Sequence, residues 1–69
     1  MFVIVYPADP NFDETDGFWG HGDKIVLNLK KAKIYSDNFF IEYPPQMPGY
    51  LKPRMISLDE AKAKYPWSY

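Results

Sequence analysis

The chain contains no cysteine, and this absence excludes several classes of function. Without thiols there is no disulfide framework, no cysteine nucleophile and no cysteine-based zinc or iron–sulfur site. Small domains bury only about 60% of the surface that their unfolded chains expose, and many rely on such cross-links or on a partner. We therefore expect aromatic side chains or a partner to supply the missing stabilisation. A chain without cysteine also suits a reducing compartment, so we expect a cytoplasmic location.

The sequence also lacks long apolar runs and an excess of positive charge. The apolar run at residues 1–6 is too short to span a membrane and lacks the basic residues of a signal peptide, so we expect no membrane association. Eight basic residues face nine acidic ones, which gives a net charge of -1. Proteins that bind nucleic acid are usually basic, so this balance disfavours that class. The length of 69 residues predicts a single small domain, residues 1–69.

Aromatic rings and prolines are abundant instead. Thirteen residues are Phe, Tyr or Trp and seven are Pro. Each large ring buries about 150–250 Å², so a few rings can form a core while others stay at an interface. This composition indicates binding more than catalysis.

Apolar patterning predicts several strands. Residues 2–6 form a continuous β-branched and aromatic run that suits a central strand with both faces covered, and Pro7 ends it. Residues 7–23 read as an extended loop or wide hairpin connection, within which Phe18 and Trp19 are candidates to start the next strand. Residues 23–29 alternate, which predicts a half-buried strand with Ile25, Leu27 and Leu29 on one face. Residues 39–43 predict a further strand after a tight turn at residues 36–38.

Capping residues and prolines mark the other elements. Asn28 can cap a single helical turn over residues 29–32, before an extended stretch at residues 33–35. Ser57 and Glu60 have capping-box spacing, which predicts a short C-terminal helix that stops before Pro66. Four prolines make residues 44–53 a stiff loop. The fold class we predict is α+β: a small antiparallel sheet of three to five short strands, one short C-terminal helix and a proline-rich loop.

The residue most typical of an enzyme is His21, the one histidine, which lies in a glycine-rich stretch two residues before Asp23. A histidine beside an acid can act as a general base. The serines lack a nucleophile motif, however, and the glycines fit neither a phosphate loop nor a dinucleotide fingerprint. We expect no catalytic residue and no enzyme activity.

A calcium site is the metal hypothesis that the spacing allows. Asp9, Asn11 and Asp13 match the first three ligand positions of an EF-hand loop. Glu14 then stands where the motif needs glycine, and Gly20 stands where it needs a bidentate glutamate. We expect no metal and no cofactor.

Two segments are candidate contacts with a protein partner. Five acids and no Lys or Arg lie between Asp9 and Asp23, and carboxylates on a small scaffold can act through complementary potentials. Rings, Met and prolines gather at residues 43–51, and these residue types are enriched at interface centres. The candidate partner-binding residues are Asp13, Glu14, Asp16, Trp19, Tyr43, Met47 and Tyr50.

A nucleic-acid-binding accessory module is the alternative. Its candidate residues are Lys24, Lys30, Lys31 and Lys33, which fall in a stretch without acids. Exposed rings such as Trp19 or Tyr35 would supply base stacking.

Residues 17–22 read Gly-Phe-Trp-Gly-His-Gly, and residues 29–36 read Leu-Lys-Lys-Ala-Lys-Ile-Tyr-Ser. This order resembles a pattern of very small phage and prophage proteins, in which a Gly/Trp hairpin precedes a Leu-x-x-Ala-Lys turn and a strand. The resemblance spans about 20 of the 69 residues, and after Ser36 the chain departs from the family's Glu/Ala-rich helix.

The resemblance implies a context in which small proteins, anti-CRISPR proteins among them, block a larger host machine. We therefore expect a non-enzymatic protein-binding module, a phage or mobile-element inhibitor that occludes the functional surface of a larger protein or ribonucleoprotein complex in the host cytoplasm. Self-association into a homodimer stays open, because exposed rings on a small sheet favour it.

Overall fold

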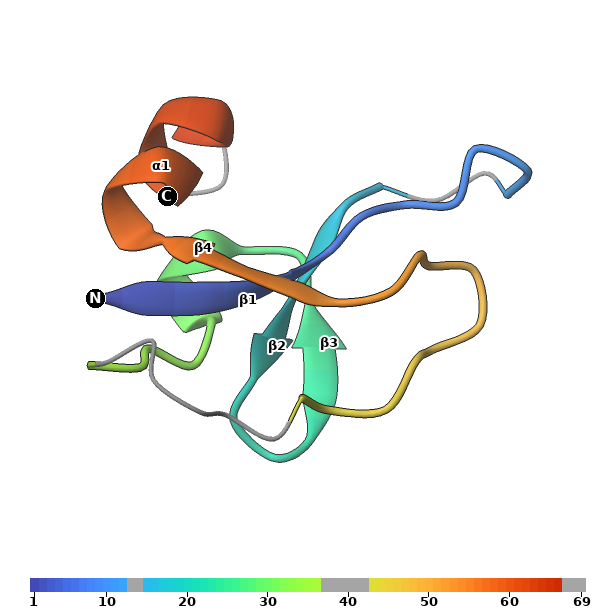
Figure 1. The fold of residues 1–69 in the computed structure, drawn as a ribbon, viewed down its shortest axis with the longest axis horizontal. Coiled ribbons are helices and arrows are strands. Elements are labelled where there is room, and N and C mark those ends of the chain that lie inside the picture. The colour runs from blue at the N-terminus through green and yellow to red at the C-terminus, as the bar shows by residue number, and fades with distance from the viewer. Residues whose placement is uncertain (13–14, 37–42, 67–69) are drawn as a thin grey trace.

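The structure, a computed structural model, describes residues 1–12, 15–36 and 43–66. In chain order its elements are β1 (Phe2–Tyr6), β2 (Gly17–Gly20), β3 (Lys24–Val26), the 3-10 helix η1 (Leu29–Lys31), β4 (Arg54–Ser57) and α1 (Leu58–Lys64). Within these described residues the strands form a four-stranded antiparallel sheet in the order β3-β2-β1-β4, followed by the C-terminal helix (Figure 1). This arrangement confirms the predicted α+β fold class.

β1 is a central strand, as its apolar run predicts. Its side chains alternate between the two sides of the sheet, where Val3 and Val5 enter one core cluster and Ile4 and Tyr6 enter the other. All four are at most 2% exposed. Because both faces of β1 are covered, its residues can be apolar without interruption.

β4 is the strand that the sequence does not reveal. It pairs with β1 from Phe2 opposite Ser57 to Val5 opposite Arg54. The stretch Arg-Met-Ile-Ser has no clear alternation and follows four prolines in residues 44–53. The pairing with β1, rather than a local preference, makes it a strand.

β1 and β2 separate along their length. They pair only at Val5–Phe18 and Tyr6–Gly17. Farther along, residues 32–35 lie against both strands, since the Lys33 amide donates to the Trp19 carbonyl at 2.9 Å. The Phe2 and Tyr35 backbones also exchange two hydrogen bonds, at 2.7 and 2.8 Å. These backbone hydrogen bonds place Lys33 next to β2 and Tyr35 next to β1.

The strand predicted over residues 23–29 is shorter than its alternation suggests, and the assignment of its apolar residues to one face is wrong. β3 ends at Val26, and Leu27 is 60% exposed. The Asn28 side chain accepts a hydrogen bond from the Lys30 amide at 2.9 Å and starts η1, which buries Leu29. The predicted cap at Asn28 is confirmed, and this cap interrupts the strand periodicity.

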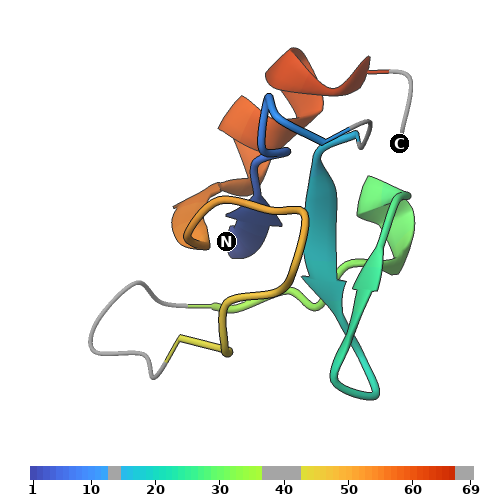
Figure 2. The same cartoon turned by 90° about the vertical axis from the view of Figure 1, so that its right-hand side faces the viewer.

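Each face of the sheet has its own cover. On one face α1 and η1 pack on β1 and β2, in a cluster that includes Phe18, Leu29 and Ala61. On the other face lies a cluster of Ile4, Tyr6 and Trp19, against which side chains of the proline-rich segment 43–53 pack. Figure 2 shows the two covers apart, with α1 in orange-red above and residues 43–53 in yellow to gold below.

The predicted C-terminal helix is confirmed as α1. The Ser57 hydroxyl accepts a hydrogen bond from the Glu60 amide at 3.1 Å, and the helix ends at Lys64, with Tyr65 as its C-cap before Pro66. Among the residues that the structure describes, no helix is long and apolar enough to cross a membrane. The predicted turn at residues 36–38 and strand at residues 39–43 fall mostly on positions 37–42, which lie outside the described residues.

Candidate protein-binding site

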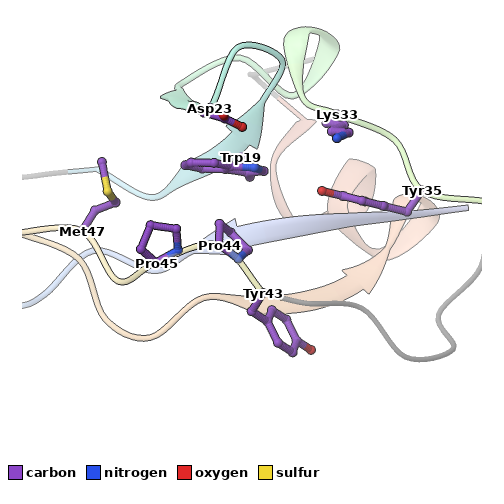
Figure 3. A pocket seen from close by; sticks show the side chains of 8 residues that line it. All are labelled: Trp19, Asp23, Lys33, Tyr35, Tyr43, Pro44, Pro45 and Met47. Carbon is purple, nitrogen blue, oxygen red and sulfur yellow. The ribbon is translucent and has the colours of Figure 1, made fainter.

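A groove of about 530 Å³ opens on the sheet face that the proline-rich segment covers (Figure 3). We call it the aromatic groove. Three separate parts of the chain build it: the β2–β3 hairpin, residues 33–35 and residues 43–47. Its lining residues are Trp19, Asp23, Lys33, Tyr35, Tyr43, Pro44, Pro45 and Met47.

Trp19 lies deepest among the lining rings and belongs to the core beneath the groove. It is 7% exposed, and its ring packs on that of Tyr6 with centroids 5.8 Å apart. Within the described residues no buried side-chain nitrogen or oxygen lacks a partner, and no described group accepts from the Trp19 indole. In Figure 3 its nitrogen lies at the end of the ring nearest Tyr35.

The proline wall is held in place by hydrogen bonds to β1 and the residues that follow it. The buried Tyr6 hydroxyl donates to the Pro45 carbonyl at 2.7 Å. The Leu51 amide donates to the Pro7 carbonyl at 2.8 Å, and the Asp9 amide donates to the Gly49 carbonyl at 3.2 Å. Burial, and next the nearby Tyr35, raise the pKa of Tyr6, so its hydroxyl keeps the proton that it donates. The wall is thus formed before any ligand arrives.

Charges of both signs stand at the rim. The Lys33 ammonium lies 5.5 Å from the centroid of the Tyr35 ring, a cation–π distance. Asp23 is exposed at the end of the hairpin turn, where Gly22 and Asp23 both have positive φ, at 80° and 55°. Figure 3 shows both charged side chains on one side of the groove, near Trp19 and Tyr35. A ligand lying here meets a carboxylate and an ammonium together.

Three of the predicted partner-binding residues, Trp19, Tyr43 and Met47, come together in this groove. Tyr43 is 52% exposed and Met47 is half-buried. Tyr50 is not among the residues that line the groove; it packs against the core cluster of Ile4, Tyr6 and Trp19, with its ring edge-on to Tyr6 and the centroids 6.0 Å apart.

The acidic residues have a different placement. Asp16 is half-buried, and both carboxylate oxygens accept hydrogen bonds within the chain: Oδ1 from the Ala8 amide at 2.8 Å and Oδ2 from the Tyr65 hydroxyl at 2.7 Å. These bonds give Asp16 a structural role. Asp13 and Glu14 lie outside the described residues.

The lysines of the alternative hypothesis are all exposed. Lys24 begins β3, and Lys30 and Lys31 belong to η1. Only Lys33 among them lines the aromatic groove. His21 is exposed in the hairpin turn, and the described residues contain no group of three or more His, Asp or Glu that could hold a metal ion.

Sequence reasoning missed part of the groove. In the sequence, Asp23 is one acid of a loop and the acid beside His21, and Tyr35 is a candidate ring for base stacking. Pro44 and Pro45 were recognised as stiffening elements rather than as a wall. The signal for each residue type is present in the sequence, but no local pattern shows that the three segments meet.

We compared the chain with protein-family models, with curated proteins and with solved structures, and none of them matches it. The functional argument therefore rests on the groove and on the residues that build it.

Proposed function

We propose that this chain is a non-enzymatic protein-binding module and that the aromatic groove is its contact surface. The observation that carries the proposal is the convergence of Trp19, Tyr35, Tyr43 and Met47 on one groove. Tyr, Trp and Met are enriched at the centres of protein interfaces, where a few well-packed anchors dominate affinity. The mixture of rings with one charge of each sign suits a polypeptide partner.

Pre-organisation supports the same function. The hydrogen bond from Tyr6 to the Pro45 carbonyl and the ring restraint of the prolines hold the wall in place. A surface that is already ordered loses less conformational entropy when it binds. A small domain can therefore bind through a limited area.

The biological context of the proposal comes from the resemblance to small phage and prophage proteins. The resembling stretches, residues 17–22 and 29–36, include three of the groove residues, Trp19, Lys33 and Tyr35. The module would then be a phage or mobile-element inhibitor that acts in the host cytoplasm. Its partner would be a larger protein or ribonucleoprotein complex whose functional surface the groove face occludes.

The test compares two substitutions of similarly exposed rings. Tyr43 lines the groove and is 52% exposed, whereas Phe12 is 57% exposed and does not line it. The tagged protein and its Tyr43→Ala and Phe12→Ala variants are used to capture partners from host lysate, with and without nuclease. The bound proteins are quantified by mass spectrometry, and light scattering gives the mass of the purified module.

We expect a stoichiometric protein partner that survives nuclease, is lost with Tyr43→Ala and is retained with Phe12→Ala. Equal recovery with both variants would show that the groove is not the contact surface. Recovery that disappears with nuclease would favour nucleic acid as the ligand.

Nucleic acid remains the second candidate because Lys33 lies in the same groove as the half-buried ring of Tyr35, although Trp19 is too buried to stack on a base. A cation beside stacking rings is the combination that holds single strands. Fluorescence anisotropy with labelled oligo(dT) tests this candidate. Binding that weakens with salt and is lost when Lys30, Lys31 and Lys33 are changed to Ala would support it.

A further inference from the structure

We infer that the aromatic groove receives a proline-rich segment of the partner in polyproline II conformation, with a basic residue placed beside Asp23. This inference rests on the proposed function and names the partner segment that the groove would recognise. Three observations support it: the hydrogen-bonding side chains of the groove, the hydrogen bond from Tyr6 to the Pro45 carbonyl, and the negative charge of Asp23.

Among the described lining residues, four of the five polar side chains can donate hydrogen bonds. The Trp19 indole, the Tyr35 and Tyr43 hydroxyls and the Lys33 ammonium can all donate, and none has a hydrogen-bond partner among the described residues. Asp23 is the one acceptor-only side chain among the described lining residues. The complementary ligand therefore offers many acceptors and few donors. A proline-rich chain does so, since its prolines lack N–H groups and a polyproline II helix leaves every carbonyl outside.

The molecule already contains one contact of this kind. The Tyr6 hydroxyl donates to the Pro45 carbonyl at 2.7 Å, and the rings of Trp19 and Tyr50 pack beside Tyr6 at 5.8 and 6.0 Å. The aromatic face of the sheet thus holds a proline carbonyl of its own chain. The groove continues this face next to the same proline wall, and the Tyr35 hydroxyl points toward Trp19 (Figure 3).

Two other ligands fit the lining less well. A peptide that adds a β-strand needs unpaired backbone, but the Trp19 carbonyl accepts from Lys33, and the Tyr35 backbone exchanges two hydrogen bonds with Phe2. A nucleic-acid strand would bring phosphates toward the Asp23 carboxylate. That same carboxylate attracts an arginine or lysine that flanks a proline run.

The experiment uses synthetic peptides and the intact, ¹⁵N-labelled chain. The probe is an acetylated, amidated peptide of six prolines followed by arginine. One control peptide ends in glutamate instead of arginine, and another has glycine in place of alternate prolines. The readout is the indole N–H resonance of Trp19, which is distinguished from that of Trp67 with a Trp67→Phe variant.

We expect the proline–arginine peptide to shift the Trp19 indole resonance in a saturable manner. The glutamate peptide should bind about twofold to fivefold more weakly, the range that an exposed ion pair gives. Asp23→Asn should remove this preference while keeping binding, because asparagine tolerates the positive φ at this position. Tyr43→Ala should weaken binding of both peptides, and Phe12→Ala should leave both unchanged.

An indole resonance that does not move, or that moves equally with the glycine-containing peptide, would overturn the inference. A second readout separates this failure from failure of the proposed function. If the lysate partner is captured in a Tyr43-dependent way but the proline–arginine peptide does not displace it, the inference fails and the protein-binding function stands. If the partner is not captured through the groove at all, both fail.

Discussion

The hydroxyl of Tyr65 donates a hydrogen bond to Oδ2 of Asp16 at 2.7 Å, across 49 residues of sequence. The other oxygen of the same carboxylate accepts from the Ala8 amide at 2.8 Å. Tyr65 follows α1 directly and packs edge-on against Phe18 with ring centroids 5.1 Å apart. A single carboxylate thus joins the residues that follow β1, the start of β2 and the end of the helix.

Removing the Tyr65 hydroxyl should destabilise the fold. Tyr65→Phe keeps the ring that packs on Phe18 but leaves Oδ2 of Asp16 without its donor. Hydrogen bonds to charged groups contribute about 1.5–3 kcal/mol, so we expect the free energy of unfolding to fall by about that amount. Chemical denaturation at neutral pH measures the change. Tyr43→Phe removes an exposed hydroxyl and serves as the control, and an equal loss in both variants would contradict the role of the bond.

Tyr65 also makes the stability depend on pH in the alkaline range. Burial first, and then the hydrogen bond and negative charge of Asp16, raise the pKa of Tyr65 from 10.0 to about 12, against an opposing effect of Arg54. Because the folded pKa is the higher one, this contribution is complete below pH 10 and is lost as the pH rises through about 12. Between these values the free energy of unfolding should fall more steeply in the unaltered chain than in Tyr65→Phe. Parallel slopes in denaturation curves across this pH range would contradict the assignment. Tyr6, whose pKa is also raised, remains in both proteins and leaves a residual slope.

Tyr6→Phe should loosen the proline wall of the groove. The substitution removes the donor to the Pro45 carbonyl and keeps the buried ring. Since Pro45 is exposed, water can replace the lost donor, and we expect a modest cost of about 0.5–1.5 kcal/mol. Amide hydrogen exchange of Leu51, whose N–H donates to Pro7, should accelerate because the wall opens locally. Unchanged exchange at Leu51 together with unchanged stability would show that the wall is held by other contacts.

Gly17 is required by close packing between β2 and β3. A Cβ atom at this position would lie 2.4 Å from Cγ2 of Ile25. Gly17→Ala should therefore destabilise the fold by about 1–3 kcal/mol, the usual cost of overpacking. Adding Ile25→Leu, which has no Cγ2 atom, should recover part of this loss. Gly22→Ala serves as the control. An added Cβ at Gly22 meets no atom within 4 Å, but the backbone φ is 80°, so this substitution destabilises the fold through backbone strain. Ile25→Leu should therefore not recover the stability lost with Gly22→Ala.

Ser57 should contribute to stability mainly as the cap of α1. Its hydroxyl accepts from the Glu60 amide at 3.1 Å, and Ser57→Ala removes that acceptor. We expect a loss of about 1 kcal/mol and a melting temperature lower by about 4–8 °C. Ser57→Asp supplies another acceptor at a helix N-terminus and should keep most of the stability. Thermal unfolding followed by circular dichroism distinguishes the two variants. If Ser57→Ala and Ser57→Asp lower the melting temperature equally, Ser57 contributes through its place in β4 rather than as the cap of α1.

Local chemistry in the sequence determined several elements of this protein. The uninterrupted apolar run of residues 2–6 requires cover on both faces, and the structure confirms β1 as a central strand. Asn28 and Ser57 start η1 and α1 because their side chains accept from amides two or three residues ahead. Such signals act within one turn of the backbone and can be read without the rest of the fold.

Contacts between distant residues decided the rest, and only the tertiary structure supplies them. β4 is a strand because it lies against β1, and Leu27 is exposed because the chain turns into η1 instead of continuing the alternation of β3. Asp16 resembles any surface acid until the Tyr65 hydroxyl is placed beside it. The aromatic groove exists because the bond between Lys33 and Trp19 and the bond between Tyr6 and Pro45 bring three segments to one face. Residue types state which contacts are favourable, but which residues meet depends on how the whole chain packs.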